Sequence, residues 1–109
     1  MAITASTKTP LNVTRMATGM YIDTGTEAAY TYSDLGFKPR YVKVVNLTSG
    51  DQEEWFEGMT AAHAHKRIAA GTAAPITSLG ITVSDRGFTI GLDTDINKDN
   101  EQVHWLALG

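Results

Sequence analysis

Apolar and polar residues alternate over short segments of this chain, and turn-forming residues separate the segments. The alternation is clearest on either side of Asp85-Arg86-Gly87, where apolar side chains stand two positions apart. A period of two places alternate side chains on one face of a β-strand. The pattern predicts strands at residues 41–45, 53–56, 80–84, 88–92 and 103–108, with weaker candidates at 16–22 and 28–32.

The same alternation predicts the core. Val83, Phe88, Ile90 and Trp105 should point into one shared apolar interior, and Trp55 lies in an alternating segment of the same kind. Short strands joined by turns, with no long helical pattern between them, are typical of a sandwich or a small barrel. We therefore predict an all-β fold, a compact antiparallel β-sandwich or jelly-roll-like domain.

Residues 60–70 fit two structures. They are rich in Ala, Lys and Arg, which are good helix formers, and Gly58 and Gly71 delimit them. Read as a strand, the segment places His63, His65 and Arg67 on one face. The strands expected on both sides favour a strand here as well.

The length of 109 residues suits one domain. We expect an extended, Thr-rich N-terminal arm over residues 1–18 and a β-sandwich domain over residues 19–109. The arm lacks the apolar core of a secretion signal, and no apolar run reaches the roughly 20 residues that span a bilayer. There is no cysteine, so no disulfide supports the fold. Synthesis in the cytoplasm, without a membrane partner, is the expectation.

The charge pattern bears on the partner. Nine Lys and Arg stand against twelve Asp and Glu, for a formal net charge of -3, and the basic residues are scattered. Nucleic-acid binding depends on a concentrated basic face that neutralises phosphates. We expect no nucleic-acid partner.

Two motifs have the residue types of a metal site. Oxygen side chains occur at every second position from Asp93 to Asp99, but Lys98 and His104 stand where a calcium loop needs glycine and a bidentate glutamate. His63 and His65 could be two ligands on one side of a strand, but no third ligand is identifiable. We interpret the first as a polar turn and expect neither a metal nor a cofactor.

Catalytic motifs are absent from the sequence. Glu53, Glu54 and Glu57 could supply paired carboxylates for glycoside hydrolysis, but such chemistry needs a deep cleft that so small a domain rarely provides. There is no nucleophile elbow, phosphate loop or dinucleotide fingerprint. We predict that the protein is not an enzyme.

Partner-binding residues are expected in two places. Tyrosines at strand ends suit an interface because their hydroxyls tolerate a half-wet position. An unpaired terminal arm can add to the edge of a neighbour's sheet. The candidates are Thr4, Thr7, Leu11, Val13, Tyr21, Tyr30 and Tyr32.

Several stretches resemble a family of small tailed-bacteriophage virion proteins: residues 37–46, 54–59, 66–72, 80–81, 87–92, 96–97 and 103–107. The resemblance implies a capsid decoration (cement) or head-fibre protein that is β-rich and often a homotrimer. It would bind the major capsid protein of a phage head and lie on the capsid surface of the virion, after synthesis in the host cytoplasm. The alternative is a tail or fibre module that binds host-surface glycan.

Overall fold

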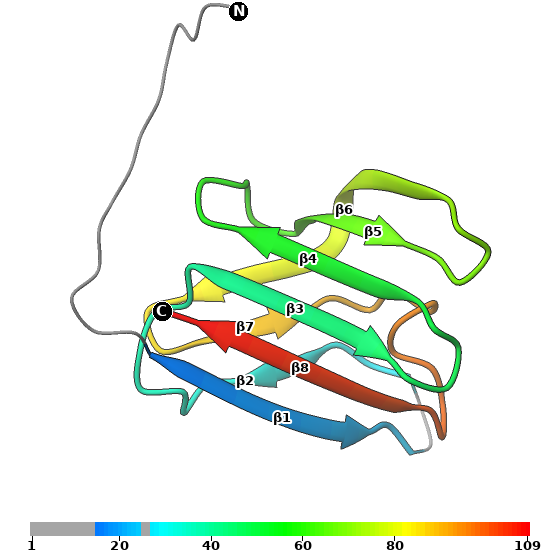
Figure 1. Cartoon of the computed structure of the whole chain (residues 1–109). Coiled ribbons are helices and arrows are strands. Elements are labelled where there is room, and N and C mark those ends of the chain that lie inside the picture. The colour runs from blue at the N-terminus through cyan, green and yellow to red at the C-terminus, as the bar shows by residue number, and fades with distance from the viewer. Residues whose placement is uncertain (1–14, 25–26) are drawn as a thin grey trace, which may run out of the picture.

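The computed structural model describes residues 15–24 and 27–109, and this part of the chain contains eight β-strands and no helix (Figure 1). All the strands belong to one antiparallel sheet, in the order β1-β8-β3-β4-β5-β6-β7-β2. Their bounds are β1 Met16–Ile22, β2 Tyr30–Tyr32, β3 Tyr41–Asn46, β4 Gln52–Phe56, β5 His63–Arg67, β6 Ala73–Ser84, β7 Gly87–Ile90 and β8 Gln102–Leu108.

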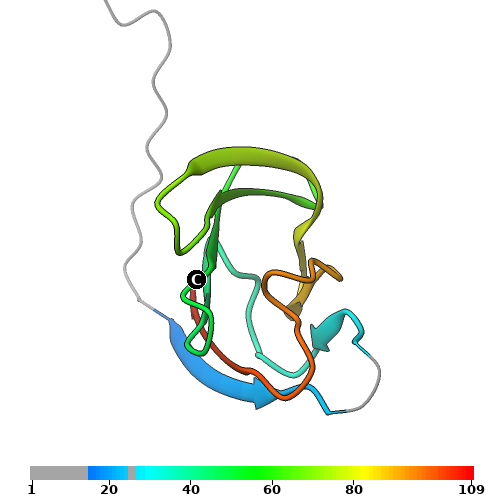
Figure 2. The ribbon, with the colours of Figure 1, turned by 90° about the vertical axis from the view of Figure 1, so that its right-hand side faces the viewer.

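The sheet curls over on itself, so its first and last strands come close together (Figure 2). Tyr21 of β1 stacks on Tyr30 of β2 with ring centroids 3.9 Å apart, although these strands stand at opposite ends of the strand order. The prediction of an all-β fold is confirmed. The architecture differs from two facing sheets because one continuous sheet supplies both walls of the interior.

Every strand predicted from alternation is present, including the two weaker candidates. The ambiguous segment at residues 60–70 contains β5, so the choice of strand is confirmed. The first half of β6 was missed, because Pro75 and the small residues around it do not resemble a strand. Residues 73–76 pair with β5 alone, and a strand with one open edge accommodates proline.

A bulge bends β6 where it passes from one neighbour to the next. The partner of Ala64 is Ile76, but the partner of His63 is Ile81, so the register jumps between them. Ala62 and Leu79 have positive φ angles of 64° and 61° beside this jump. The bend directs the second half of β6 toward β7 and so contributes to the curl.

The core lies inside the curl, as the alternation predicts. Phe88, Ile90 and Trp105 are buried, and Val83 is half-buried against them. Phe88 meets Trp105 edge to face, with ring centroids 4.9 Å apart. Trp55 is also buried, as predicted. The assumption that these side chains share one interior is confirmed.

A glycine in β1 allows this strand to pack directly against Trp105. Gly19 pairs with Trp105 in the β1–β8 ladder, and a Cβ atom on Gly19 would stand 2.4 Å from the indole. The indole therefore covers the space where a side chain would be, as aromatic residues do opposite glycine in other sheets.

We predict that Gly19→Ala lowers the free energy of unfolding by about 1–3 kcal/mol, because the added methyl group displaces a buried ring. Urea denaturation gives this value directly. Thr18→Ala is the matched control, since Thr18 is exposed on the opposite face of the same strand. Equal stability of Gly19→Ala and the wild type would contradict the packing described.

Candidate functional site

The connection between β7 and β8, residues 91–101, turns inward and fills one end of the curled sheet. Its Ile96 and Asn97 are fully buried, and Asp93 nearly so. Asn97 Nδ2 donates to the carbonyl of Gly91 at 3.1 Å, and the Tyr21 hydroxyl donates to Asn97 Oδ1. This polar segment is therefore held inside the fold.

Asn46, at the end of β3, secures the same segment from the other wall. Its Nδ2 donates to the carbonyl of Ile96 and to Glu101 Oε1, both at 2.9 Å. Its Oδ1 accepts the backbone N–H groups of Thr48 and Ser49, also at 2.9 Å. One buried amide thus joins the β3–β4 turn to residues 91–101.

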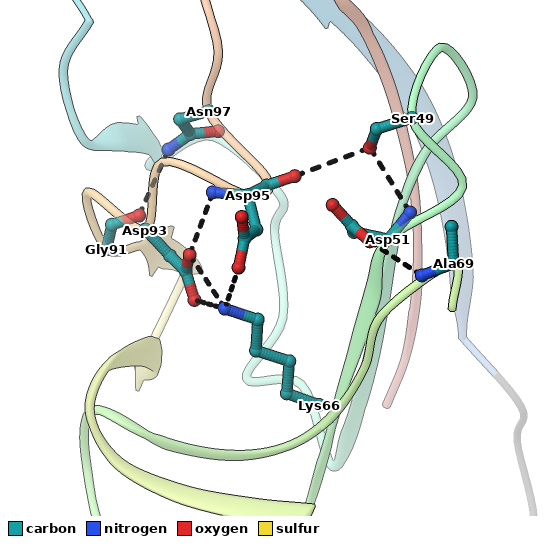
Figure 3. A network of polar contacts seen from close by, with 8 residues as sticks. All are labelled: Ser49, Asp51, Lys66, Ala69, Gly91, Asp93, Asp95 and Asn97. Carbon is teal, nitrogen blue, oxygen red and sulfur yellow. Dashed lines mark hydrogen bonds and ion pairs between the residues drawn. The ribbon is translucent and has the colours of Figure 1, made fainter. Parts of the chain in front are cut away.

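Lys66 of β5 forms ion pairs with two acidic residues of this segment, Asp93 and Asp95 (Figure 3). Its ammonium contacts Asp93 Oδ2 and Asp95 Oδ2 at 2.7 Å each. Asp93 Oδ1 also accepts the backbone N–H of Asp95 at 2.9 Å. Burial alone would raise the pKa of Asp93, but Lys66 and this N–H outweigh it and hold that pKa below its usual range. Burial would likewise lower the pKa of Lys66, but its two carboxylate partners raise it.

Glu53 of β4 is fully buried beside this pair, and it lacks a compensating donor. Neither of its carboxyl oxygens accepts a hydrogen bond within the described part of the chain. Burial raises the pKa of Glu53 to about 8, Asp93 adds to the shift, and Lys66 offsets only part of it. Glu53 is therefore a neutral acid at pH 7, able to donate its proton toward Asp93.

Residues 94–96 form a turn, as expected for the stretch interpreted as a polar turn, and Asp93 at its start forms a buried ion pair with Lys66. The position that a cation would take between Asp93 and Asp95 holds the Lys66 ammonium. Among residues 15–24 and 27–109, no three His, Asp or Glu side chains converge so as to hold a metal ion. His63 is half-buried and His65 exposed, with Ala64 buried between them on β5.

The predicted partner-binding tyrosines lie in the gap between the two ends of the sheet. Tyr21 stacks on Tyr30, and burial raises the pKa of Tyr21, with the nearby charges adding to the shift. Tyr32 packs against Trp105, with ring centroids 5.3 Å apart. All three are half-buried, so their rings contact the core or each other. The other candidates, Thr4, Thr7, Leu11 and Val13, lie outside the described residues.

The glutamates considered for catalysis do not converge. Glu54 accepts a hydrogen bond from the Tyr41 hydroxyl at 2.6 Å on the outer face of the sheet, opposite to buried Glu53. Glu57 pairs with Arg40 at 3.5 Å in an exposed position. These three glutamates therefore do not flank one cleft as the paired carboxyl groups of a glycoside hydrolase do.

An apolar row on the outer face of the sheet was missed by the sequence reading. Met16, Leu108, Tyr41 and Phe56 are successive partners across β1, β8, β3 and β4. Met16 is 65% exposed and Phe56 50% exposed. Glu54, Arg40 and Glu57 place charges beside this row. An apolar centre beside charged groups is the usual composition of a protein interface.

The signal for this row was ambiguous in the sequence. In β1 the inward residues include Ala17 and Gly19, whereas Met16, Met20 and Ile22 point outward. Both faces of the strand are therefore apolar, and hydropathy alone cannot say which one is buried.

A groove of about 310 Å³ lies between β4, the turn after it and β6. Buried Trp55 forms part of its wall, and the Trp55 indole N–H donates to the carbonyl of Thr60 at 3.4 Å. Lys38 and Glu57 also line the groove, which places both signs of charge in it.

Comparison with known proteins gives no relative: no family model, curated protein or solved structure matches the chain. Within the described ranges there is no helix long and apolar enough to cross a membrane.

The raised pKa of Glu53 makes the free energy of unfolding depend on pH, and it determines the direction of the change. The folded chain keeps the Glu53 proton up to about pH 8, whereas the unfolded chain releases it near pH 4.5. Raising the pH through this window therefore favours the unfolded state, by up to about 1.4 kcal/mol for each pH unit. We predict that Glu53→Gln removes this loss, because a neutral amide cannot ionise and can donate to Asp93.

The test is urea denaturation of both proteins at pH 5 and pH 8. The stability difference in favour of Glu53→Gln should grow from pH 5 to pH 8. Glu54→Gln, on the outer face of the same strand, controls for the loss of one carboxylate. A difference that stays constant over this range would show that Glu53 titrates normally.

Proposed function

We propose that this protein is a capsid decoration (cement) protein that binds the assembled head of a tailed bacteriophage. The observation that carries the proposal is the continuous row of Met16, Leu108, Tyr41 and Phe56 on the outer face of the sheet, whose two end members are exposed. The resemblance of residues 37–46 and 54–59 to small virion proteins supports it, and these residues include two members of the row.

The proposed mechanism is thermodynamic. Each Å² of apolar area removed from water contributes about 25 cal/mol to the free energy of binding. An apolar row on a sheet can therefore bind a partner through surface burial alone, with no reaction. A protein that binds the assembled lattice but not its separated subunits stabilises the lattice by mass action. Ring contact between Tyr41 and Phe56, with centroids 5.2 Å apart, holds one end of the row in place before binding.

The experiment adds the protein to phage heads that lack it and measures the temperature at which the heads release DNA. The wild type should bind in many copies per head and raise this temperature. Phe56→Ser should reduce both effects, because it removes an exposed side chain of the row. Leu79→Ser is the matched control, since Leu79 is also exposed but lies on β6.

Mass spectrometry and cryo-microscopy of intact particles give the location independently. High copy number on the shell is the expected result. A few copies at the tail, or heads whose stability does not change, would contradict the proposal.

The second candidate is a tail or fibre module that binds host-surface glycan, and the groove at Trp55 favours it. Sugar sites combine an aromatic wall with charged groups, and Lys38 and Glu57 stand at this groove. Glycan-array binding that is lost in Lys38→Ala and Glu57→Gln, together with no binding to heads, would establish this function instead.

A further inference from the structure

Strand β1 is an open edge of the sheet. It pairs with β8 alone, and no described strand hydrogen-bonds to its other side, although β2 approaches it through the ring contact of Tyr21 and Tyr30 (Figure 1). Arg15 and Gly109 exchange backbone hydrogen bonds of 3.4 and 2.8 Å, so the peptide groups of Arg15 face β8. Because antiparallel ladders alternate, the N–H and C=O groups of Met16, Thr18, Met20 and Ile22 face the open side.

β1 itself lacks the residues that normally protect an exposed sheet edge. Exposed edges usually bear charged residues or proline, or are very short, since an unprotected edge pairs with other chains. β1 has seven residues, none of them charged and none proline. Its outward side chains include Met20 at 46% and Ile22 at 51% exposure. The opposite edge of the sheet, β2, has only three residues.

We propose that β1 is a dimer interface, at which two copies of this chain pair their β1 strands antiparallel about a two-fold axis at Gly19. In this register Met16 lies opposite Ile22 of the second copy, and Thr18 opposite Met20. All four residues have their backbone groups on the open side, so the ladder continues without a break. The two curled sheets become one continuous sheet.

Charge complementarity selects this register. Arg15 lies immediately before β1 and Asp23 immediately after it, and the Gly19 axis places Arg15 opposite Asp23 of the second copy. Asp23 is held in place there, because its Oδ2 accepts the backbone N–H of Ala28 at 3.1 Å. Two opposite-charge pairs therefore bracket an uncharged strand.

The neighbouring two-fold registers lose both the pairing of Arg15 with Asp23 and the unbroken ladder along the whole of β1. An axis at Thr18 places Arg15 opposite Tyr21, and an axis at Met20 places Asp23 opposite Ala17. Each leaves one end of β1 without a strand partner.

This symmetry differs from the trimer that the family resemblance implies. Pairing of one strand edge with its own copy is an isologous contact, which closes on two-fold symmetry. The inference stands apart from the proposed function: it requires no capsid, and it leaves Tyr41 and Phe56 free on the outer face.

Light scattering on the full chain tests the proposal. A dimer of the 11.8 kDa chain is expected, dissociating on dilution. Met20→Lys should shift the dimer to monomer. Each copy then carries a lysine in the middle of its β1 edge, and a charged residue on an edge strand opposes pairing with another strand. Leu79→Lys, with the same new charge at an exposed leucine on β6, should remain dimeric. A monomeric or trimeric wild type, or a Met20→Lys variant that associates normally, would overturn the proposal.

The register has its own test. Arg15→Asp and Asp23→Arg each bring two like-charge pairs together and should each weaken the dimer roughly tenfold. The double variant restores opposite charges and should recover the wild-type affinity at low salt. Circular dichroism checks that each variant is folded. Single variants without effect, or a double variant no better than the singles, would rule out the Gly19 axis.

Discussion

The structure depends on satisfying the hydrogen bonds of the polar segment that closes the curled sheet. Residues 91–101 bring Asp93 and Asn97 into the interior, where an unpaired polar group costs about 1–3 kcal/mol. Asn46, Tyr21 and Lys66 supply the partners from three different strands. These strands can meet the segment only when the sheet is curled, so curling and closure stabilise each other.

Electrostatics explain why one acid in this interior stays neutral. The single ammonium of Lys66 already compensates Asp93 and Asp95, so no positive charge remains for Glu53. Asp95 is exposed, so an ionised Glu53 would be a second buried carboxylate beside Asp93, and protonation is its less costly state. The polar groups of this end thus stabilise the fold, and the two binding surfaces that we propose lie elsewhere, on the outer face and at the open edge.

Alternation predicted most of the strands and the core around Phe88 and Trp105, although it missed the first half of β6 and left β5 ambiguous. It failed where a residue's environment is set by distant parts of the chain. Asp93 looks like part of a solvated turn, but its partner Lys66 lies 27 residues earlier. Asn97 meets Tyr21 across 76 residues. The sandwich arrangement is not confirmed for a related reason: local periodicity does not report whether strands share one sheet or two.

The proposed binding surfaces could not be predicted from the sequence for a different reason. Small inward residues in β1 made both of its faces apolar, so the outward Met16 and Met20 had no distinguishing pattern. The tyrosines were chosen as half-wet interface residues. They are half-buried, but the contacts that bury Tyr21 and Tyr30 come from the meeting of β1 with β2, which only the curl creates.

Hydrogen exchange followed by NMR tests the central claim most directly. The amides of Thr48 and Ser49 donate to Asn46 Oδ1, and the amides of Ile96 and Asn97 donate to the Asp93 carbonyl. If closure of the sheet depends on these bonds, all four amides should exchange as slowly as those of β3 and β8, through global unfolding. Exchange on the timescale of an exposed turn would show that the sheet holds its shape without them.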